Sequence, residues 1–303
     1  PYSFGGKEYP NGTLIITRGD NEGDFMSKLI DIAKKHSVEL TPTITGMMDS
    51  GIDLGSSSVN LIKKKKIALL TGPSTSSLNV GEVWNFMDNE LNYPIQLMQP
   101  DNISSSILKT LDVLIVPEGW YSQLSDENTQ SELKSWLFEG GKLIAIGESC
   151  GYFTSENGYS LKAKEGNKED EEKEEKHEHA HVRYADQERE SIKSIVNGAI
   201  FKCEVDTTHP LAFGYGNQYY SLKLSANAYE LLEDGDNVVY LAKDALAISG
   251  FVGSEVKAAQ SNSLIFGKSE MGRGSVVYLV DNPLFRGFWE GGKLFFVNAI
   301  FLD

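Results

Sequence analysis

The sequence contains little cysteine, little histidine and little positive charge. Its 303 residues include two cysteines, five histidines and 28 lysines and arginines, against 43 aspartates and glutamates, which gives a formal net charge of −15. Two cysteines are too few for a disulfide framework, and we expect Cys150 and Cys203 to be separate buried thiols, with a single disulfide between them as the alternative. The negative balance argues against nucleic acid or an anionic membrane as the main partner, because both are bound through clustered lysine and arginine.

Long apolar runs are also missing. No run approaches the roughly 18 residues of a transmembrane helix, so the sequence predicts no membrane span. The basic cluster at residues 63–66 leads straight into an apolar strand and is interpreted as a linker. The chain begins with Pro1 and shows no basic-then-apolar export signal, so we expect a processed product or a part of a longer protein.

Residues 1–62 are expected to form a small αβ linker segment. The apolar pattern predicts a strand over residues 13–17, an amphipathic helix over residues 24–35 and a second strand before Pro42. A stretch rich in glycine and serine, residues 46–60, is typical of a loop.

From residue 63 onward, short apolar strands alternate with amphipathic helices. The expected strands cover residues 67–70, 111–116 and 143–146. One intervening helix should turn Val80, Val83, Trp84, Met87 and Leu91 inward, and the next should be capped by Ser125 and stop at Gly140 and Gly141. This alternation predicts an α/β fold, a flavodoxin-like parallel sheet flanked by helices.

The second half of the chain departs from this order. Residues 162–190 include a run of charged side chains with nothing apolar to bury, which indicates a solvated acidic insertion. After it, alternating Phe201, Cys203 and Val205 and three further apolar runs predict more strands. We therefore expect extra antiparallel sheet within a second domain that spans residues 63–303.

The C-terminal residues carry the most specific pattern. An apolar strand over residues 275–280 is followed by Asp-Asn-Pro-Leu-Phe-Arg-Gly-Phe-Trp at residues 281–289 and by an amphipathic segment at residues 293–301. This combination resembles the C-terminal region of bacterial M14-type zinc carboxypeptidases, which is similar to class I glutamine amidotransferases. The resemblance covers most of the chain and is most specific from Asp281 to Phe301.

The resemblance implies a class I amidotransferase-like fold and an exported bacterial protein, periplasmic or extracellular. It also implies that zinc and peptide hydrolysis belong to an upstream peptidase domain of the same polypeptide, with no zinc ligand and no cofactor in this chain. The expected function is then that of a non-catalytic accessory domain that packs on or regulates the peptidase. Candidates for its contact surface, chosen because arginine and aromatic side chains are enriched in binding hot spots, are Phe285, Arg286, Phe288 and Trp289.

One pattern favours a different function. Residues 147–151, Gly-Glu-Ser-Cys-Gly, match G-x-S-x-G, in which small residues allow a tight turn that exposes a nucleophile above the sheet. Ser149 would occupy the nucleophile position, where class I amidotransferases place a cysteine, and Cys150 lies one residue later. The alternative is therefore a serine or cysteine hydrolase, or an amidotransferase, that uses Ser149 or Cys150.

Such a nucleophile needs a base, and the sequence offers few. No histidine follows His209, and the loop where the resemblance would place one begins with Asp281. The hydrolase alternative would combine Ser149 with Asp206 and His209. We favour the structural interpretation, in which Asp206 to His209 form a turn before a proline and the elbow is a relic of the fold.

Two binding hypotheses remain. His177, His179 and His181 stand at alternating positions and offer imidazole ligands for a metal, although their charge-dense surroundings favour adventitious binding. A small ligand at the carboxyl ends of the strands would lie near Gly72, Gly119 and Gly147, because open α/β sheets usually hold ligands there.

Overall fold

The computed structural model describes residues 1–21, 23–164 and 183–302. It divides into two compact units, residues 1–62 and residues 63–303.

The first unit is a small three-stranded antiparallel sheet with one helix. The sheet has the order β2-β1-β3, with β1 at Tyr2–Phe4, β2 at Lys7–Tyr9 and β3 at Ser50–Gly51. Gly5 and Gly6 both have positive φ, which suits the tight turn between β1 and β2. Helix α1, Phe25–Lys35, is capped by Asp24 and confirms the predicted helix.

The two strands predicted in the first unit are wrong. Residues 13–17 and the residues before Pro42 form no strand, because neither run pairs with a neighbour. Among the described residues of this unit, Ala33 is the one hydrophobic residue that is buried, while Leu14, Ile32 and Ile44 are exposed. The first unit therefore has almost no core of its own.

Five parallel strands make up one half of the large sheet in the second unit. Their spatial order is β5-β4-β6-β7-β13, and all four pairings are parallel. This is the flavodoxin-like order 2-1-3-4-5, which confirms the predicted fold class. The strands are β4 Ile67–Leu70, β5 Gln96–Met98, β6 Val113–Val116, β7 Lys142–Ile146 and β13 Gly274–Leu279.

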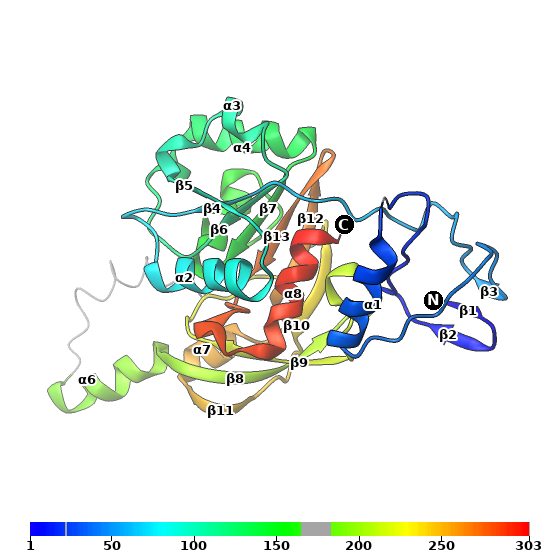
Figure 1. Ribbon diagram of the computed structural model, residues 1–303. Helices are drawn as coiled ribbons and strands as arrows, with labels where there is room; N and C mark the ends of the chain where they lie inside the picture. The colour runs from blue at the N-terminus through cyan, green and yellow to red at the C-terminus, as the bar shows by residue number, and fades with distance from the viewer. Residues whose placement is uncertain (22, 165–182, 303) are drawn as a thin grey trace. The chain divides into compact units, whose positions relative to one another are not determined.

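The other half of the sheet is antiparallel, as the sequence predicts. Strand β12 pairs with β13, β10 follows β12, and β8 pairs with β10, β9 and β11. The strands are β8 Val196–Val205, β9 Gln218–Lys223, β10 Asp236–Leu241, β11 Ala247–Val252 and β12 Ser263–Met271. Figure 1 shows β8, β9 and β11 gathered at the opposite end of the sheet from β5.

Helices cover both faces of the parallel half. They are α2 Ser77–Asn85, α3 Ser105–Leu108, α4 Glu127–Glu139 and α8 Glu290–Phe301, while α6 Tyr184–Ser191 and α7 Ser254–Ala259 accompany the antiparallel strands. Short 3-10 turns lie at Pro100–Asn102, Gln123–Ser125, Gly147–Phe153, Ser155–Asn157, Ile192–Ser194, Pro210–Ala212 and Phe285–Gly287. Within the described ranges, no helix combines the length and apolar character needed to cross a bilayer.

Helix α4 corrects one capping prediction and confirms another. Its N-cap is Asp126, whose carboxylate accepts a hydrogen bond from Thr129 N, whereas the predicted cap Ser125 ends the preceding 3-10 turn. The carboxylate of Asp126 is the better cap because it is placed to accept from the first turn of the helix. The helix stops at Gly140, which adopts the left-handed conformation as predicted.

Helix α2 continues into a π-helical turn, Phe86–Glu90, and this changes which side chains face the core. A π turn holds more residues than an α turn and rotates the side chains that follow it. Val83, Phe86 and Met87 are buried, but Trp84 and Leu91 are exposed. The prediction that Trp84 and Leu91 face inward is wrong. The π turn accounts for Leu91, which follows it, whereas Trp84 precedes the turn and lies on the exposed side of α2.

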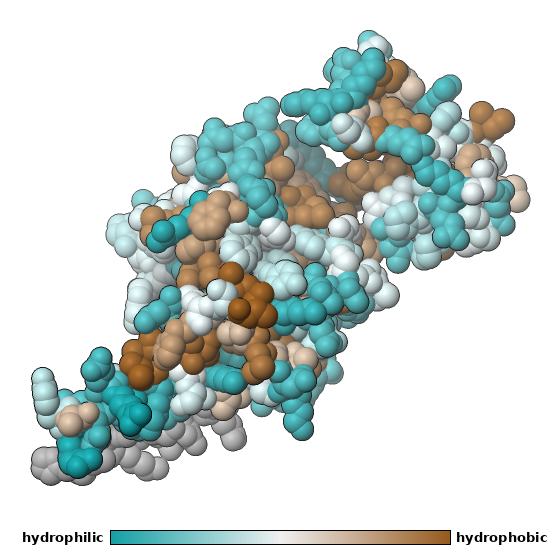
Figure 2. Space-filling view, turned by 90° about the horizontal axis from the view of Figure 1, so that it is seen from below, coloured by the Kyte–Doolittle hydropathy of each residue, from teal (hydrophilic) through white to brown (hydrophobic). Residues whose placement is uncertain are grey.

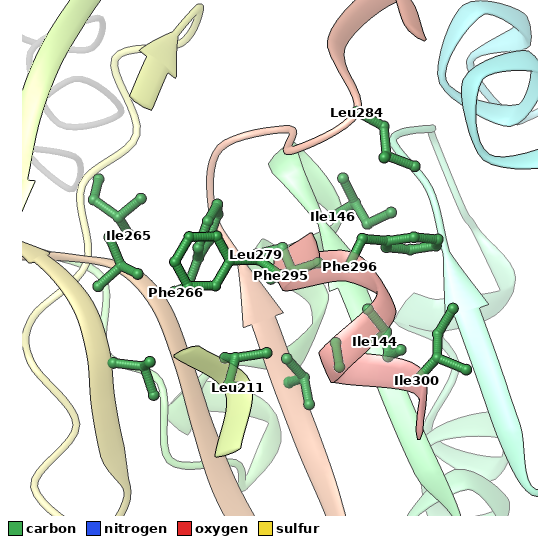
Figure 3. Packing of buried hydrophobic residues seen from close by; sticks show 14 of the residues in the cluster. Ile144, Ile146, Leu211, Ile265, Phe266, Leu279, Leu284, Phe295, Phe296 and Ile300 are labelled. Atoms are coloured by element: carbon green, nitrogen blue, oxygen red, sulfur yellow. The ribbon is translucent and has the colours of Figure 1, made fainter. Parts of the chain in front are cut away.

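Two hydrophobic clusters lie on the two faces of the sheet. One joins the strands to α2 and α8, and Figure 3 shows Phe295, Phe296 and Ile300 of α8 packed over Ile144 and Leu279. The other lies under α4 and includes Leu133 and Trp136. Burial on both faces is the reason why β4 and β6 are apolar throughout and β7 is apolar after Lys142.

Candidate functional site

The residues that follow the parallel strands meet at one edge of the sheet, where the sequence places most of the candidate site residues. The predicted elbow forms the 3-10 turn that follows β7. Its first residue, Gly147, has φ of 60°, and a side chain there would lie 2.0 Å from Glu118 Oε1. A glycine is therefore required both by the backbone and by the neighbouring carboxylate.

Ser149 does not face solvent. Its hydroxyl is fully buried, accepts a hydrogen bond from Ile146 N at 2.9 Å, and lies 2.8 Å from Val116 O and 2.9 Å from Ile146 O. Because Val116 ends β6 and Ile146 ends β7, the hydroxyl braces two neighbouring strands. The side chain has the position of a structural bridge, with its hydrogen-bonding capacity used by the backbone.

Both cysteines are buried and free, as the sequence predicts. Cys150 Sγ lies 3.6 Å from Ala145 O, and burial raises the pKa of its thiol far above the ordinary value. Burial raises the pKa of the Cys203 thiol on β8 in the same way. A thiol that does not ionise is a poor nucleophile, so neither cysteine is prepared for catalysis.

The structure does not assemble the triad of the hydrolase alternative. His209 Nδ1 accepts a hydrogen bond from Leu211 N at 3.0 Å, and its Nε2 lies 3.4 Å from Asp236 Oδ2. Asp206 accepts hydrogen bonds from the hydroxyl and the N–H of Thr208, as the turn interpretation expects. Within the described residues, no imidazole hydrogen-bonds Ser149 or Cys150.

The three glycines proposed to surround a ligand have different surroundings. Gly119 lies against the loop that follows β4, where a side chain would come within 2.5 Å of Ser74 O, and Thr75 forms a β-bridge with it. Gly147 lies under the carboxylate of Glu118, so both of these glycines serve close packing. Gly72 lines a hollow beside α2. Of the three, Gly72 is the one placed next to open space.

Sequence reasoning missed a group of carboxylates at this edge. Glu118 follows β6, and the pKa of its carboxyl is raised to about 7 by burial first and then by the negative charges of Glu148, Glu82 and Asp281. In the described parts of the chain, no group donates a hydrogen bond to this carboxylate. A carboxyl with this pKa exchanges protons near neutral pH, but without a nucleophile it has no partner for covalent catalysis. The position of Glu118 directly after a buried strand was the one available signal.

Asp281 is buried and held by two partners from β9. Lys223 Nζ lies 2.8 Å from Asp281 Oδ1, and Ser221 Oγ donates to Asp281 Oδ2 at 2.6 Å. Both Lys223 and Asp281 are buried. The ion pair fixes the start of the loop over residues 281–289 at the place where the resemblance would put a histidine. Asp281 is therefore engaged in a buried ion pair with Lys223.

The rest of that loop is held by α2. Glu82 accepts hydrogen bonds from Asn282 Nδ2 and from Arg286 N, both at 2.6 Å. The backbone of Arg286 has φ of 49°, an uncommon conformation for a residue with a long side chain. The guanidinium of Arg286 lies over the ring of Phe285, which in turn packs edge-on against Phe288.

The four residues proposed as a contact surface are not equally available. Arg286 and Phe288 are exposed, and Phe288 retains 59% of its surface. Phe285 is half-buried, and Trp289 turns inward, with its indole N–H donating to Tyr219 Oη at 3.2 Å. Trp289 is therefore partly buried and packs against the hydrophobic core, so it offers less free surface than Arg286 and Phe288.

The metal hypothesis concerns residues outside the described ranges. His177, His179 and His181 lie outside them. In residues 1–21, 23–164 and 183–302, no group of three histidine, cysteine, aspartate or glutamate side chains is arranged to hold a metal ion.

Comparison with known proteins finds no matching family model and no similar curated protein. Among solved structures, the chain is similar to the N-terminal domain of mmIFT52, with 13% identity, coverage of 77% of this chain and 95% of that chain, and a TM-score of 0.48. A ThuA-like protein from Bacteroides uniformis shows 10% identity, coverage of 78% and 90%, and a TM-score of 0.46. A glutamine amidotransferase from Thermotoga maritima shows 8% identity, coverage of 73% and 77%, and a TM-score of 0.42. Likenesses of this extent say nothing about activity.

Proposed function

We propose that this chain is a non-catalytic domain of amidotransferase-like fold that serves as the accessory part of an exported bacterial zinc carboxypeptidase. Peptide hydrolysis and zinc would belong to an upstream M14-type domain of the same polypeptide, and no residue of this chain is assigned to that metal. The observation that carries the proposal is the use of the Ser149 hydroxyl as a brace between β6 and β7.

The position of Ser149 favours a silent site over the hydrolase alternative. A catalytic serine must reach both a substrate carbonyl and a base, whereas this hydroxyl is buried and bonded to backbone. Cys150 is buried as well, and burial raises the pKa of its thiol. A fold that keeps the turn after β7 but uses its polar atoms internally is suited to packing or binding.

Two surfaces support a packing role. The loop over residues 285–288 presents Arg286 and Phe288 on a backbone that Glu82 holds in place, so little conformational freedom is lost on contact with a partner. The first unit exposes most of its large apolar side chains, which supports its role as the segment that bridges toward another domain.

The proposal that Ser149 and Cys150 are unreactive is tested with active-site probes. The folded chain is treated with a fluorophosphonate that labels reactive serines and with iodoacetamide, and the product is mapped by mass spectrometry. We expect no labelling of Ser149 or Cys150 in the native protein, and labelling of Cys150 by iodoacetamide once the chain is unfolded. Stoichiometric native labelling of either residue would overturn the proposal.

The accessory role is tested by association. The coding sequence upstream of Pro1 is examined for an M14-type zinc domain, that domain is produced separately, and its affinity for residues 1–303 is measured by calorimetry. We expect Phe288→Ala to weaken binding by about tenfold or more, as the loss of an aromatic anchor does. Phe138→Ala is the matched control, because Phe138 is 57% exposed and lies on α4 over the other face. Absence of such an upstream domain, or equal effects of the two variants, would contradict the role.

A further inference from the structure

A hollow lies between helix α2 and the edge strand β5. Its volume is about 340 Å³, and it is lined by Thr71, Gly72 and Thr75 after β4, by Ser77, Val80, Gly81 and Trp84 of α2, and by Leu97 of β5. Figure 1 shows α2 and β5 at the same end of the sheet. The hollow lies at the carboxyl end of β4, on the side of β5. Open α/β sheets usually hold their ligands outside the carboxyl ends of their strands.

Gly81 lines the hollow, and no side chain of the described chain fills the space beside it. It lies in the middle of α2, where its helical backbone conformation is open to any residue. A side chain built at Gly81 would meet no atom within 4 Å, so no packing within the described chain requires a glycine. A glycine inside a helix costs about 1 kcal/mol relative to alanine. Alanine at this position is therefore expected to stabilise the helix without a clash.

The walls of the hollow select an uncharged, apolar group. None of the lining residues carries a charge. Trp84 and Leu97 keep 46% and 55% of their surfaces exposed at the rim, and Val80 contributes a further apolar wall. Burying a charged group here would cost desolvation without a compensating partner, whereas an aromatic or branched aliphatic group gains free energy from burial.

Strand β5 adds a directional feature to the same hollow. Among the described strands it pairs with β4 alone, and no described strand pairs with its other edge. Met98 O accepts a hydrogen bond from Thr71 N, which points the polar groups of Met98 toward β4. Because successive residues of a strand point their polar groups to opposite sides, the N–H and C=O of Leu97 point outward. Leu97 therefore offers backbone hydrogen bonds at the rim of the apolar hollow.

We propose that this groove binds an extended peptide. The peptide backbone pairs with the outer edge of β5 at Leu97, and one apolar side chain enters the hollow over Gly81, against Trp84. Pairing with a sheet edge supplies affinity through the backbone, and a side-chain pocket beside the edge supplies specificity. This site is separate from the loop over residues 285–288, and the inference does not depend on the proposed peptidase parent.

The test uses the full chain and a defined probe. Acetyl-Thr-Phe-Thr-Phe-Thr-amide is titrated into residues 1–303 up to about 1 mM, the range of weak specific binding, while the indole signal of Trp84 is followed by nuclear magnetic resonance. We expect saturable binding of this peptide and at least about tenfold weaker binding of the same peptide with lysine in place of phenylalanine. Absence of binding by the phenylalanine peptide, or equal binding of both, would overturn the proposal.

Two variants of Gly81 separate the filling of the groove from damage to the fold. Gly81→Leu is expected to fill the hollow and to abolish binding while the helix becomes more stable, since leucine is a better helix former than glycine. Gly81→Ala should stabilise the helix equally and leave most of the hollow open, so it keeps binding. Leu78→Ala, an exposed position of α2 that does not line the hollow, is the control for surface change. Binding that survives Gly81→Leu would place the peptide elsewhere and reject the site.

A last pair of probes distinguishes an extended peptide from a small apolar molecule. N-acetylphenylalaninamide carries the same ring without a strand, and a peptide methylated on its backbone nitrogens cannot pair with β5. Each is expected to bind at least about tenfold more weakly than the parent peptide. Equal affinity of N-acetylphenylalaninamide would show that the hollow takes a small molecule, and would reject the pairing with β5.

Discussion

The two halves of the large sheet bury their residues in different ways. Every residue of β4, β6, β7 and β13 is buried, because helices cover both faces of the parallel half. In β8 buried and less buried residues alternate toward the C-terminal end, and β11 is exposed along most of its length. A strand buried on both sides is constrained at each position, whereas a strand with a free face is constrained at alternate positions.

The free face of the antiparallel half is unusually apolar. Leu224, Ile248 and Phe251 are exposed on or next to β9 and β11. Figure 2, which views the molecule from the side of β8 and β11, shows hydrophobic surface gathered on this part of the second unit. The antiparallel strands β10 and β12 still contribute buried residues to the core, whereas exposed side chains of β11 such as Ile248 should be replaceable with little loss of stability.

The largest expected effect lies where the two halves are tied together. Lys223→Met removes the partner of buried Asp281 and leaves its charge uncompensated, so we expect a loss of about 3–5 kcal/mol in the free energy of unfolding. Denaturation with urea measures it. The double variant Lys223→Met with Asp281→Leu should recover much of the loss, since no isolated charge remains. A single variant as stable as the wild type would show that this pair does not tie the halves.

The comparison itself is tested by one matched pair of isoleucines. Ile144→Ala, at a fully buried position of β7, should cost about 2–5 kcal/mol because it leaves a cavity. Ile248→Ala, at a position of β11 that keeps 58% of its surface, should stay within about 0.5 kcal/mol of the wild type. Thermal and urea unfolding of both variants give the two values. Similar losses of unfolding free energy in the two variants would contradict the difference in burial between the two halves.

Within the parallel half, Ser149→Ala should cost about 1–3 kcal/mol. The change leaves Ile146 N without its acceptor and removes the donor to the backbone at the ends of β6 and β7, and buried polar groups without partners are costly. Urea unfolding measures the loss, and Ser155→Ala on the nearby surface serves as the control. An unchanged free energy of unfolding would show that the hydrogen bonds of Ser149 do not stabilise the fold.

The smallest effect depends on pH. The pKa of Glu118 is raised to about 7 in the folded chain from an ordinary value of 4.5, so the native state holds a proton that the unfolded state releases. Stability should therefore fall as pH rises from about 4.5 to about 7 and stay lower above it. Glu118→Gln should remove this dependence and add about 1–2 kcal/mol at pH 8, after allowance for partial exposure, with no gain at pH 4. Urea unfolding of the wild type and the variant at pH 4 and pH 8 measures this difference in stability. An equal gain in stability at pH 4 would contradict the raised pKa of Glu118.

The sequence predicted the elements whose signal is local. The apolar runs of β4, β6 and β7 and the alternation in β8 mark strands without knowledge of any partner. Strand β5 was missed because Gln96, Leu97 and Met98 form too short a run to stand out. The strand predicted over residues 13–17 was wrong because an apolar run becomes a strand only where another strand pairs with it.

The candidate site depends on contacts between distant residues, and these could not be predicted. The motif around Ser149 was recognised, but its hydroxyl is bonded to Val116 O, 33 positions earlier in the chain. The pKa of Glu118 is raised first by burial and then by carboxylates from three other segments. Trp289 was expected at the surface, and the partner that draws it inward is Tyr219. Ser149 and Trp289 were identified from the sequence and their surroundings were not, whereas Glu118 was missed altogether.

The position of β13 has a consequence for the order in which the sheet assembles. This strand comes after all the others in the chain, yet it lies between parallel β7 and antiparallel β12 and joins the two halves. During synthesis, both halves are complete before their joining strand exists, so β7 and β12 each present an open edge to the solvent until then. The pairing of β7 with β13 also spans a long stretch of chain, and such pairings slow folding. A nascent chain that stalls before Gly274 should therefore be a target for chaperones and for edge-to-edge aggregation.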